Sequence, residues 1–142
     1  MLRVASVGHG DVVFDLGCGD GKVLLAALRA GAKAAVGYEL DPSLAAVAAG
    51  NIAAAGAGGA ATVFTADARS ADVSAATVVT MYLSETGNRQ LLEALQPSLT
   101  PGTRLVTYCF PVPGLEGSLL RVDTSDNVPV FLYRHAGPTP RR

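Results

Sequence analysis

The segment most suited to chemistry is a glycine-rich turn that follows an apolar run ending in an acid, Val12-Val-Phe-Asp15-Leu-Gly17-Cys-Gly19-Asp-Gly21. Glycine lets the backbone approach a ligand closely and adopt positive φ angles. The spacing GxGxG differs from the GxGxxG of dinucleotide-binding turns, which place a pyrophosphate at a helix N-terminus. A carboxylate at Asp15 would repel a pyrophosphate, whereas it suits an ammonium group. The turn therefore predicts a site for a ligand that carries a cationic amine.

Acids also follow the next two apolar runs. Glu39 ends the second run, at the place where an acid can accept hydrogen bonds from both hydroxyls of a ribose. We favour this role for Glu39 because an acid that ends an apolar strand has no evident structural purpose. Asp67 follows the third run and could accept from an adenine amino group, although Asp in such a place is often a turn or cap residue. Asp41 is interpreted as a helix N-cap because Pro42 follows it.

One ligand satisfies all of these groups. The carboxyl ends of parallel strands meet at one edge of a sheet, so the glycine turn and the acids are expected to lie together. S-adenosylmethionine (SAM) combines a cationic amine, a ribose and an adenine. The sequence therefore predicts a SAM site.

The elements that must position this site form an alternating pattern. Short apolar runs alternate with helix-compatible runs, which predicts an α/β fold built from successive βα units. Strands are expected at 11–16, 34–40, 61–66, 77–83 and 103–110, and helices at 21–30, 42–55 and 88–99. An antiparallel hairpin is expected from two β-rich stretches, 118–123 and 128–134, around a turn. We expect one domain over residues 1–136 and a disordered tail over 137–142.

The segments 15–21 and 37–42, together with Asp67, resemble motifs I, II and III of the class I, seven-β-strand methyltransferases. The resemblance implies a Rossmann-like, mostly parallel seven-stranded sheet in the order 3-2-1-4-5-7-6, with strand 7 antiparallel and helices on both faces. It implies SAM as cofactor and S-adenosylhomocysteine (SAH) as product. It implies that the turn with Gly17, Cys18, Gly19 and Gly21 holds the methionine part, Glu39 the ribose, and Asp67 with Ala68 the adenine. Asp15 and Leu40 complete the expected cofactor-binding residues.

A narrower resemblance covers most of the chain. The segments 73–83 and 99–106, with Asn88, are similar to the small protein-lysine methyltransferases of archaea, bacteria and mitochondria. The segment 109–113, Cys-Phe-Pro-Val-Pro, resembles the mitochondrial members in particular. This resemblance implies transfer of a methyl group to a lysine side chain, and the implied partner is a protein with an accessible lysine.

The chain departs from this group at three positions. Archaeal members carry His and an acid where this chain has Tyr108 and Cys109, and a bulkier apolar residue in place of Gly87. These differences concern substrate handling more than cofactor binding. Members of the group also have a segment before the position of Met1 that covers the cofactor, so we expect the present chain either to bind SAM more weakly than they do or to lack activity.

The acceptor channel is expected at the end of the fourth strand, which neighbours the glycine turn in this topology. The candidate residues are Met81, Tyr82, Leu83, Ser84 and Glu85. We expect Tyr82 to form an aromatic wall, with core packing as an equally weighted alternative. Glu85 could attract the incoming lysine, although a solvated helix start is the favoured interpretation. The sulfonium supplies the reactivity, so no metal is expected.

Composition excludes several function classes. The 142 residues carry 11 Lys and Arg against 12 Asp and Glu, a formal net charge of −1, so no nucleic-acid partner is expected. Cys18 and Cys109 form neither a disulfide framework nor a CxxC pair, which indicates a reducing compartment. We expect a cytoplasmic protein, since a mitochondrial one would need an import segment. The uncharged stretch 44–64 is rich in Ala and Gly, so no membrane span is expected.

Other function classes stay open. A SAM-dependent methyltransferase of a small molecule, a non-catalytic SAM-binding module and a nicotinamide-binding dehydrogenase are the alternatives. Methylation of exocyclic base amines fits less well, because such enzymes carry Asn/Asp-Pro-Pro-aromatic after strand 4, where this chain has Met81-Tyr-Leu-Ser84. No oligomeric state is predicted.

Overall fold

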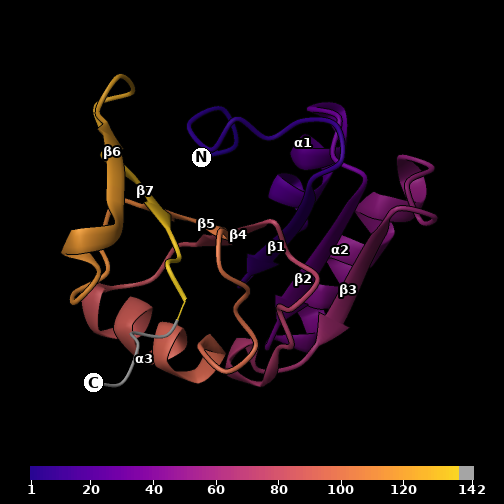
Figure 1. The fold of residues 1–142 in the computed structure, drawn as a ribbon. Helices are drawn as coiled ribbons and strands as arrows, with labels where there is room; N and C mark the ends of the chain where they lie inside the picture. Colours follow the sequence, from indigo (N-terminus) through magenta and orange to yellow (C-terminus); the bar gives the residue numbers. More distant parts are fainter. Residues whose placement is uncertain (138–142) are drawn as a thin grey trace.

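A twisted sheet with helices on both faces dominates the computed structural model, which describes residues 1–137 (Figure 1). Within these residues seven strands lie in the order β3-β2-β1-β4-β5-β7-β6. β7 runs antiparallel to both of its neighbours, and the other pairs are parallel. This arrangement confirms the predicted fold. The strands are β1 Val12–Leu16, β2 Ala34–Glu39, β3 Ala61–Thr65, β4 Val78–Met81, β5 Arg104–Tyr108, β6 Leu119–Asp123 and β7 Val130–Arg134.

The two faces of the sheet bury separate clusters. Side chains alternate along a strand, so Val13 of β1 packs on one face and Phe14 on the other. The first face is covered by α1 (Lys22–Arg29) and α2 (Pro42–Ala54), and the second by α3 (Glu85–Leu95). Two 3-10 turns, η1 (Ala68–Ser70) and η2 (Glu116–Ser118), complete the elements of the described residues.

Helix α2 begins where local chemistry predicts. The Asp41 carboxylate accepts a hydrogen bond from the N–H of Ser43 at 2.8 Å, and Pro42 occupies the first helical position. The uncharged stretch 44–64 folds into the rest of α2 and into β3. Within residues 1–137, no helix has the length and apolar character needed to cross a membrane.

The region around β4 and α3 differs from the prediction. α3 begins at Glu85 rather than 88, because the Ser84 hydroxyl caps it by accepting from the N–H of Gly87 at 3.0 Å. It ends at Leu95, two residues before a proline that has no N–H to continue the helix. β4 ends at Met81 rather than 83. All other bounds agree with the predicted ranges to within two residues.

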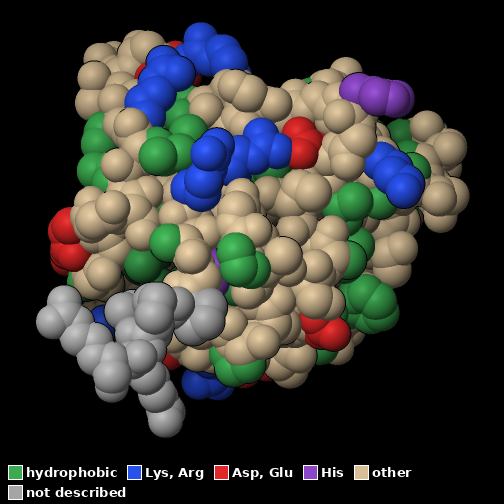
Figure 2. All heavy atoms as spheres, in the orientation of Figure 1, with side chains coloured by type: hydrophobic (Ala, Val, Ile, Leu, Met, Phe, Trp, Pro, Cys, Tyr) green, Lys and Arg blue, Asp and Glu red, His purple; other side chains and the backbone are tan. Residues whose placement is uncertain are grey.

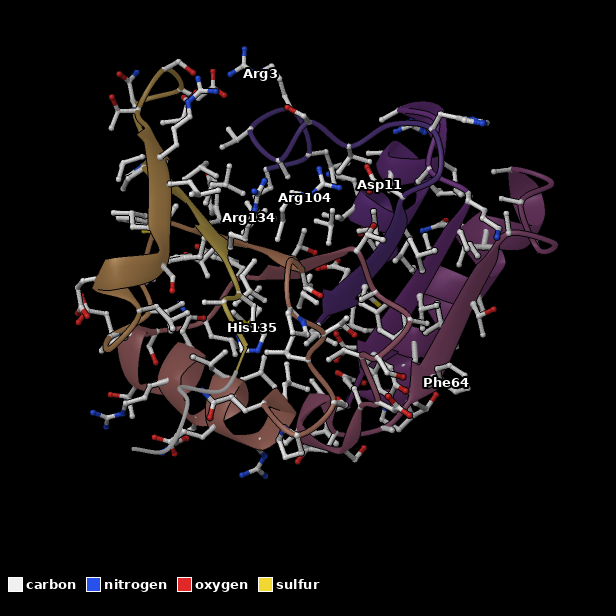
Figure 3. All side chains as sticks on the ribbon, viewed as in Figure 1. Arg3, Asp11, Phe64, Arg104, Arg134 and His135 are labelled. Carbon is white, nitrogen blue, oxygen red and sulfur yellow. The ribbon has the colours of Figure 1, made fainter. Side chains whose placement is uncertain are left out.

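The N-terminal residues pack across the α1 face, which the sequence did not predict. Val4 and Ala5 are buried there. The guanidinium of Arg104 donates to the Ala5 carbonyl and to the Asp11 carboxylate, and Figure 3 shows Arg104 and Asp11 beside each other. The Thr77 hydroxyl donates to Asp11 at 2.7 Å. Except for Gly137, the predicted tail 137–142 lies outside the described residues.

Candidate cofactor and acceptor site

The glycine turn opens toward solvent at the carboxyl end of β1. Gly17 and Gly19 have φ angles of 93° and 54°, in the left-handed region that favours glycine. A Cβ built on either residue would meet no atom within 4 Å. The N–H of Gly17 and that of Cys18 donate to the Tyr38 carbonyl at 2.8 and 2.9 Å. The turn is therefore anchored to β2 while its outer side forms an open cradle.

Glu39 joins this turn to the start of α2. Its Oε1 accepts from the N–H of Gly19 at 2.9 Å, and its Oε2 accepts from the N–H of Asp41 at 3.0 Å. The expectation that this acid has no structural purpose is therefore wrong. Each carboxylate oxygen has a second lone pair, so Glu39 keeps acceptor sites for the two hydroxyls of a ribose.

A first cavity of about 280 Å³ brings together the residues expected to hold the nucleoside. It lies between the carboxyl ends of β1 and β2, the segment after β3, and α3. Its lining includes the predicted contacts Glu39, Leu40, Asp67 and Ala68. Sequence reasoning missed Tyr38, whose ring packs against Phe64 with centroids 5.2 Å apart. It also did not place Gly87, Gln90 and Leu91 at the cavity, because the packing of α3 against the carboxyl end of β1 cannot be read from the sequence.

Asp67 already has a partner at the surface. It accepts from the Arg69 backbone N–H at 2.9 Å and from the Arg69 guanidinium at 2.7 Å. These hydrogen bonds hold the pKa of Asp67 below its ordinary value. The cap interpretation of Asp67 is thus confirmed, since this residue caps η1. An adenine amino group at Asp67 would share the carboxylate with Arg69.

A second cavity of about 320 Å³ lies on the α1 side of the sheet. Its lining includes Asp15, whose carboxylate is buried and accepts from the Thr80 hydroxyl at 2.7 Å. Burial raises the pKa of Asp15 to about 7, and the charge of Glu39 acts in the same direction. A cation bound beside Asp15 would favour its ionised form.

The two cavities meet at the glycine turn. Gly17 lines both of them. A ligand laid across the turn would place a ribose at Glu39 and an ammonium group toward Asp15, and the open cradle leaves room for its backbone contacts. These acceptors and this space fit SAM.

Tyr82 lies at the acceptor side of the second cavity. It is 60% exposed, so the core-packing alternative is wrong. Its ring meets that of Tyr108 edge to face, with centroids 5.1 Å apart and planes at 74°. Both rings line the second cavity. The sequence analysis named Tyr108 only as a departure that concerns substrate handling and did not place it in the channel, although tyrosines at the ends of two neighbouring strands were a usable signal.

The other predicted acceptor residues lie elsewhere. Met81 is fully buried in the α3-side core, so it supports the site from within rather than lining it. Leu83 lines the first cavity with Glu39, because the chain turns toward α3 after β4. Glu85 is exposed in the first turn of α3, where a negative charge stabilises a helix N-terminus. Met81 and Leu83 are corrections to the predicted channel, whereas the favoured interpretation of Glu85 as a solvated helix start is confirmed.

Cys18 is a packing residue of the turn. It is buried, and burial, with the charges of Asp15 and Glu39, raises the pKa of its thiol to about 12. The thiol is therefore protonated near neutral pH and is a poor nucleophile.

Comparisons with known proteins agree with this geometry. Residues 15–119 match the ANTKMT methyltransferase domain. The chain is 37% identical over 136 residues to a protein-lysine N-methyltransferase of Saccharolobus islandicus, covering 94% of this chain and 84% of the relative. The chain belongs to the ANTKMT methyltransferase domain family. As a member of this family it is a SAM-dependent methyltransferase.

Two further relatives extend the comparison. The mouse adenine nucleotide translocase lysine N-methyltransferase is 30% identical over 132 residues, which cover 93% of this chain but 58% of the relative. A crystal structure from Salinibacter ruber, described as an RNA methyltransferase in complex with SAH, superposes with a TM-score of 0.90 at 33% identity. That match covers 99% of this chain and 91% of the other. The SAH complex supports a SAM site in this family member.

Proposed function

We propose that this methyltransferase transfers the methyl group to lysine side chains of proteins. The observation that carries the proposal is the second cavity, where Asp15 and two tyrosine rings stand beside the glycine turn. A lysine has a long apolar stem and a cationic tip, which suit an aromatic wall. The archaeal relative, of which this chain covers 84%, is named for the same activity.

The acceptor lysine can attack the methyl group only as a neutral amine, so the site has to favour loss of its proton. Lysine has an ordinary pKa of about 10.4, so deprotonation near pH 7.4 costs roughly 4 kcal/mol. Burial of the lysine tip against the rings of Tyr82 and Tyr108 would exclude water from the amine, and this desolvation would lower the cost by disfavouring the ammonium form. When bound, SAM supplies an electrophilic methyl group. Glu39 and Asp15 would orient the cofactor, so that the acceptor amine is aligned with it.

Charge favours a protein acceptor over RNA. The two cavities are lined by four acids, Asp15, Asp20, Glu39 and Asp67, and by two bases, Lys22 and Arg69. Such a lining attracts a cationic acceptor and repels a phosphate backbone. Proteins that bind single-stranded nucleic acid instead use a positively charged groove.

The basic side chains gather at another place. Figure 2 shows Lys and Arg side chains over the upper part of one face, where Figure 3 labels Arg3, Arg104 and Arg134. Arg104 begins β5 and pairs in register with Arg134, which ends the antiparallel β7. Arg104 and Arg134 therefore lie at the amino ends of the parallel strands, whereas the cavities lie at their carboxyl ends. Arg3 lies apart from them, because its guanidinium donates to the Ser125 hydroxyl at 2.9 Å in the turn between β6 and β7.

Calorimetric titration with SAH, with NADH as the control ligand, tests the cofactor site. Transfer of label from methyl-labelled SAM to a cell extract then tests the acceptor. We expect label in protein that resists ribonuclease and is lost when lysines are acetylated beforehand. Label in RNA, label that survives lysine acetylation, or the absence of SAH binding would refute the proposal.

We also propose a cytoplasmic location. Both cysteines, Cys18 and Cys109, are free thiols, which suits a reducing compartment. Fluorescence of the tagged full-length protein in its own cells would test this, and a signal confined to an organelle or to the envelope would contradict it.

A further inference from the structure

Sheet register places two aromatic rings at one position of the site. β4 and β5 pair in parallel, with Met81 beside Thr107. The next residues along each strand are Tyr82 and Tyr108, so both rings leave the sheet side by side and on the same face. Their edge-to-face contact, with centroids 5.1 Å apart, follows from this register.

The same face carries the buried acid. Asp15 of β1 pairs in register with Thr80 of β4. The Asp15 carboxylate accepts a hydrogen bond from the Thr80 hydroxyl at 2.7 Å. Tyr82 follows Thr80 by two residues, so it projects to the same side. The second cavity is therefore bounded by Asp15 on one side and by two rings, set at 74° to each other, on the other.

Two rings set at 74° to each other form a corner suited to an alkylated cation. An ammonium or alkylammonium group within about 6 Å of an aromatic centroid is attracted to the ring face. Each methyl group on an amine replaces a hydrated N–H by apolar surface while the positive charge stays. Aromatic corners therefore bind methylated ammonium groups better than the unmethylated ion, which is more strongly hydrated.

We propose that Tyr108, together with Tyr82, binds the acceptor nitrogen and prefers its methylated forms, so that Tyr108 determines how many methyl groups a lysine receives. This inference rests on the proposed function. Retention of monomethyl-lysine and dimethyl-lysine in the aromatic corner would allow further rounds of transfer before the product leaves. Tyr108 touches the substrate in this assignment and is distinct from the residues that hold the nucleoside.

The test compares three peptides that differ in one side chain. One peptide carries lysine, one carries trimethyl-lysine, and one carries the neutral isostere in which carbon replaces the nitrogen. Binding to the SAH-loaded protein is measured by calorimetry. We expect the wild type to prefer trimethyl-lysine over the neutral isostere by about tenfold, as a partly buried cation–π contact would give.

Two variants separate the effect of the aromatic ring from the effect of side-chain volume. Tyr108→Phe keeps the aromatic face and should keep the preference. Tyr108→Leu keeps apolar volume without the ring and should lose most of the preference for trimethyl-lysine over the neutral isostere. Mass spectrometry should also show its products shifted from trimethyl-lysine toward monomethyl-lysine. Leu120→Ala, at a half-exposed position of β6, is the matched control and should behave as wild type.

Several outcomes would overturn the inference. Equal binding of trimethyl-lysine and the neutral isostere by the wild type would show that no cation is recognised. An unchanged product distribution in Tyr108→Leu would also refute it while leaving the proposed function intact. Loss of SAH binding in Tyr108→Leu would assign the ring to cofactor support instead. If the wild type binds SAH yet methylates no lysine, the proposed function itself fails.

Discussion

At the residue scale, Glu39 performs two tasks. It accepts one hydrogen bond from the glycine turn and another from the start of α2, and it lines the first cavity with acceptor capacity to spare. The carboxylate thus shapes the cradle and offers the ribose its acceptors. A change at Glu39 is expected to affect folding and cofactor affinity together.

Replacing Glu39 by Ala should weaken SAH binding by about 1.5 to 3 kcal/mol, the contribution of hydrogen bonds to a charged group. Glu39→Gln keeps one acceptor oxygen and should lose less. Calorimetry gives both affinities, and thermal unfolding of the unliganded variants separates loss of the two backbone bonds from loss of the ligand contact. Wild-type affinity in Glu39→Ala would place the ribose elsewhere.

Asp15 should make the protein sensitive to pH in two opposite ways. Because its pKa is raised from 3.8 to about 7, the folded state holds this proton more tightly than the unfolded state. The free energy of unfolding without ligand should therefore fall as pH rises from about 4 to about 7, and then level off. SAM affinity should rise through pH 7, because its cationic amine prefers the ionised carboxylate.

Asp15→Asn is the control for both effects. It cannot ionise, so its SAM affinity should be low and should vary little between pH 6 and pH 8, as measured by titration calorimetry at several pH values. Equal pH dependence in this variant and in the wild type would assign the titration to another group.

At the element scale, the glycine turn depends on the strand beside it. A Cβ on Gly37 of β2 would lie 2.6 Å from Cys18 Sγ and 2.8 Å from Leu24 Cδ1. Cβ atoms in proteins do not approach other heavy atoms so closely. The glycine turn and α1 can therefore pack against β2 at this position only because Gly37 has no side chain. Gly50 in α2 is a contrasting case, since a Cβ there would meet nothing within 4 Å.

Gly37→Ala should destabilise the fold by about 1 to 3 kcal/mol through overpacking, and it should weaken SAH binding because the turn is displaced. Gly50→Ala should stabilise α2 by about 0.5 to 1 kcal/mol, because alanine is the better helix former. Urea denaturation of both variants measures the two effects. The same sign for both substitutions would contradict the packing argument.

At the scale of the whole molecule, Arg104 connects segments that are distant in sequence. It bonds the Ala5 carbonyl and the Asp11 carboxylate, and it thereby fixes the N-terminal residues across the α1 face. Met1, at the far end of this segment, lines the second cavity. The tie at the amino end of β5 therefore helps to shape a cavity at the carboxyl end of the sheet.

Arg104→Met should cost about 1.5 to 3 kcal/mol of stability, because a charged hydrogen-bond donor is lost. It should also speed hydrogen exchange of the amides in residues 1–7.

Burial acts to raise the pKa of Asp11, but hydrogen bonds from Thr77 and Gly8 and the charge of Arg104 together lower it. The stability contributed by Asp11 should thus be present above about pH 4 and be lost as pH falls further.

A double-mutant cycle with Asp11→Asn checks this tie. The two substitutions should be non-additive, since they remove the same contact. Additive effects on the free energy of unfolding, or unchanged exchange in the N-terminal segment, would show that the N-terminal residues are held by their apolar contacts alone.

The sequence by itself determined the features that depend on neighbouring residues. The positions of the strands along the chain follow from the alternation of apolar runs and the terminal hairpin, whereas their order in the sheet was implied by the resemblance to class I methyltransferases. The glycine turn, the cap at Asp41 and the acid at Glu39 follow from residue types within a few positions. These features obey local rules of φ angles, capping and periodicity, so they could be predicted without coordinates.

Only the tertiary structure decided which side chains share a cavity. The register of β4 and β5 sets Tyr82 against Tyr108, and the early start of α3 turns Leu83 toward the nucleoside side. Burial in the core removes Met81 from the channel and raises the pKa of Asp15. Register and burial arise from contacts between residues far apart in the chain, and no local pattern encodes them.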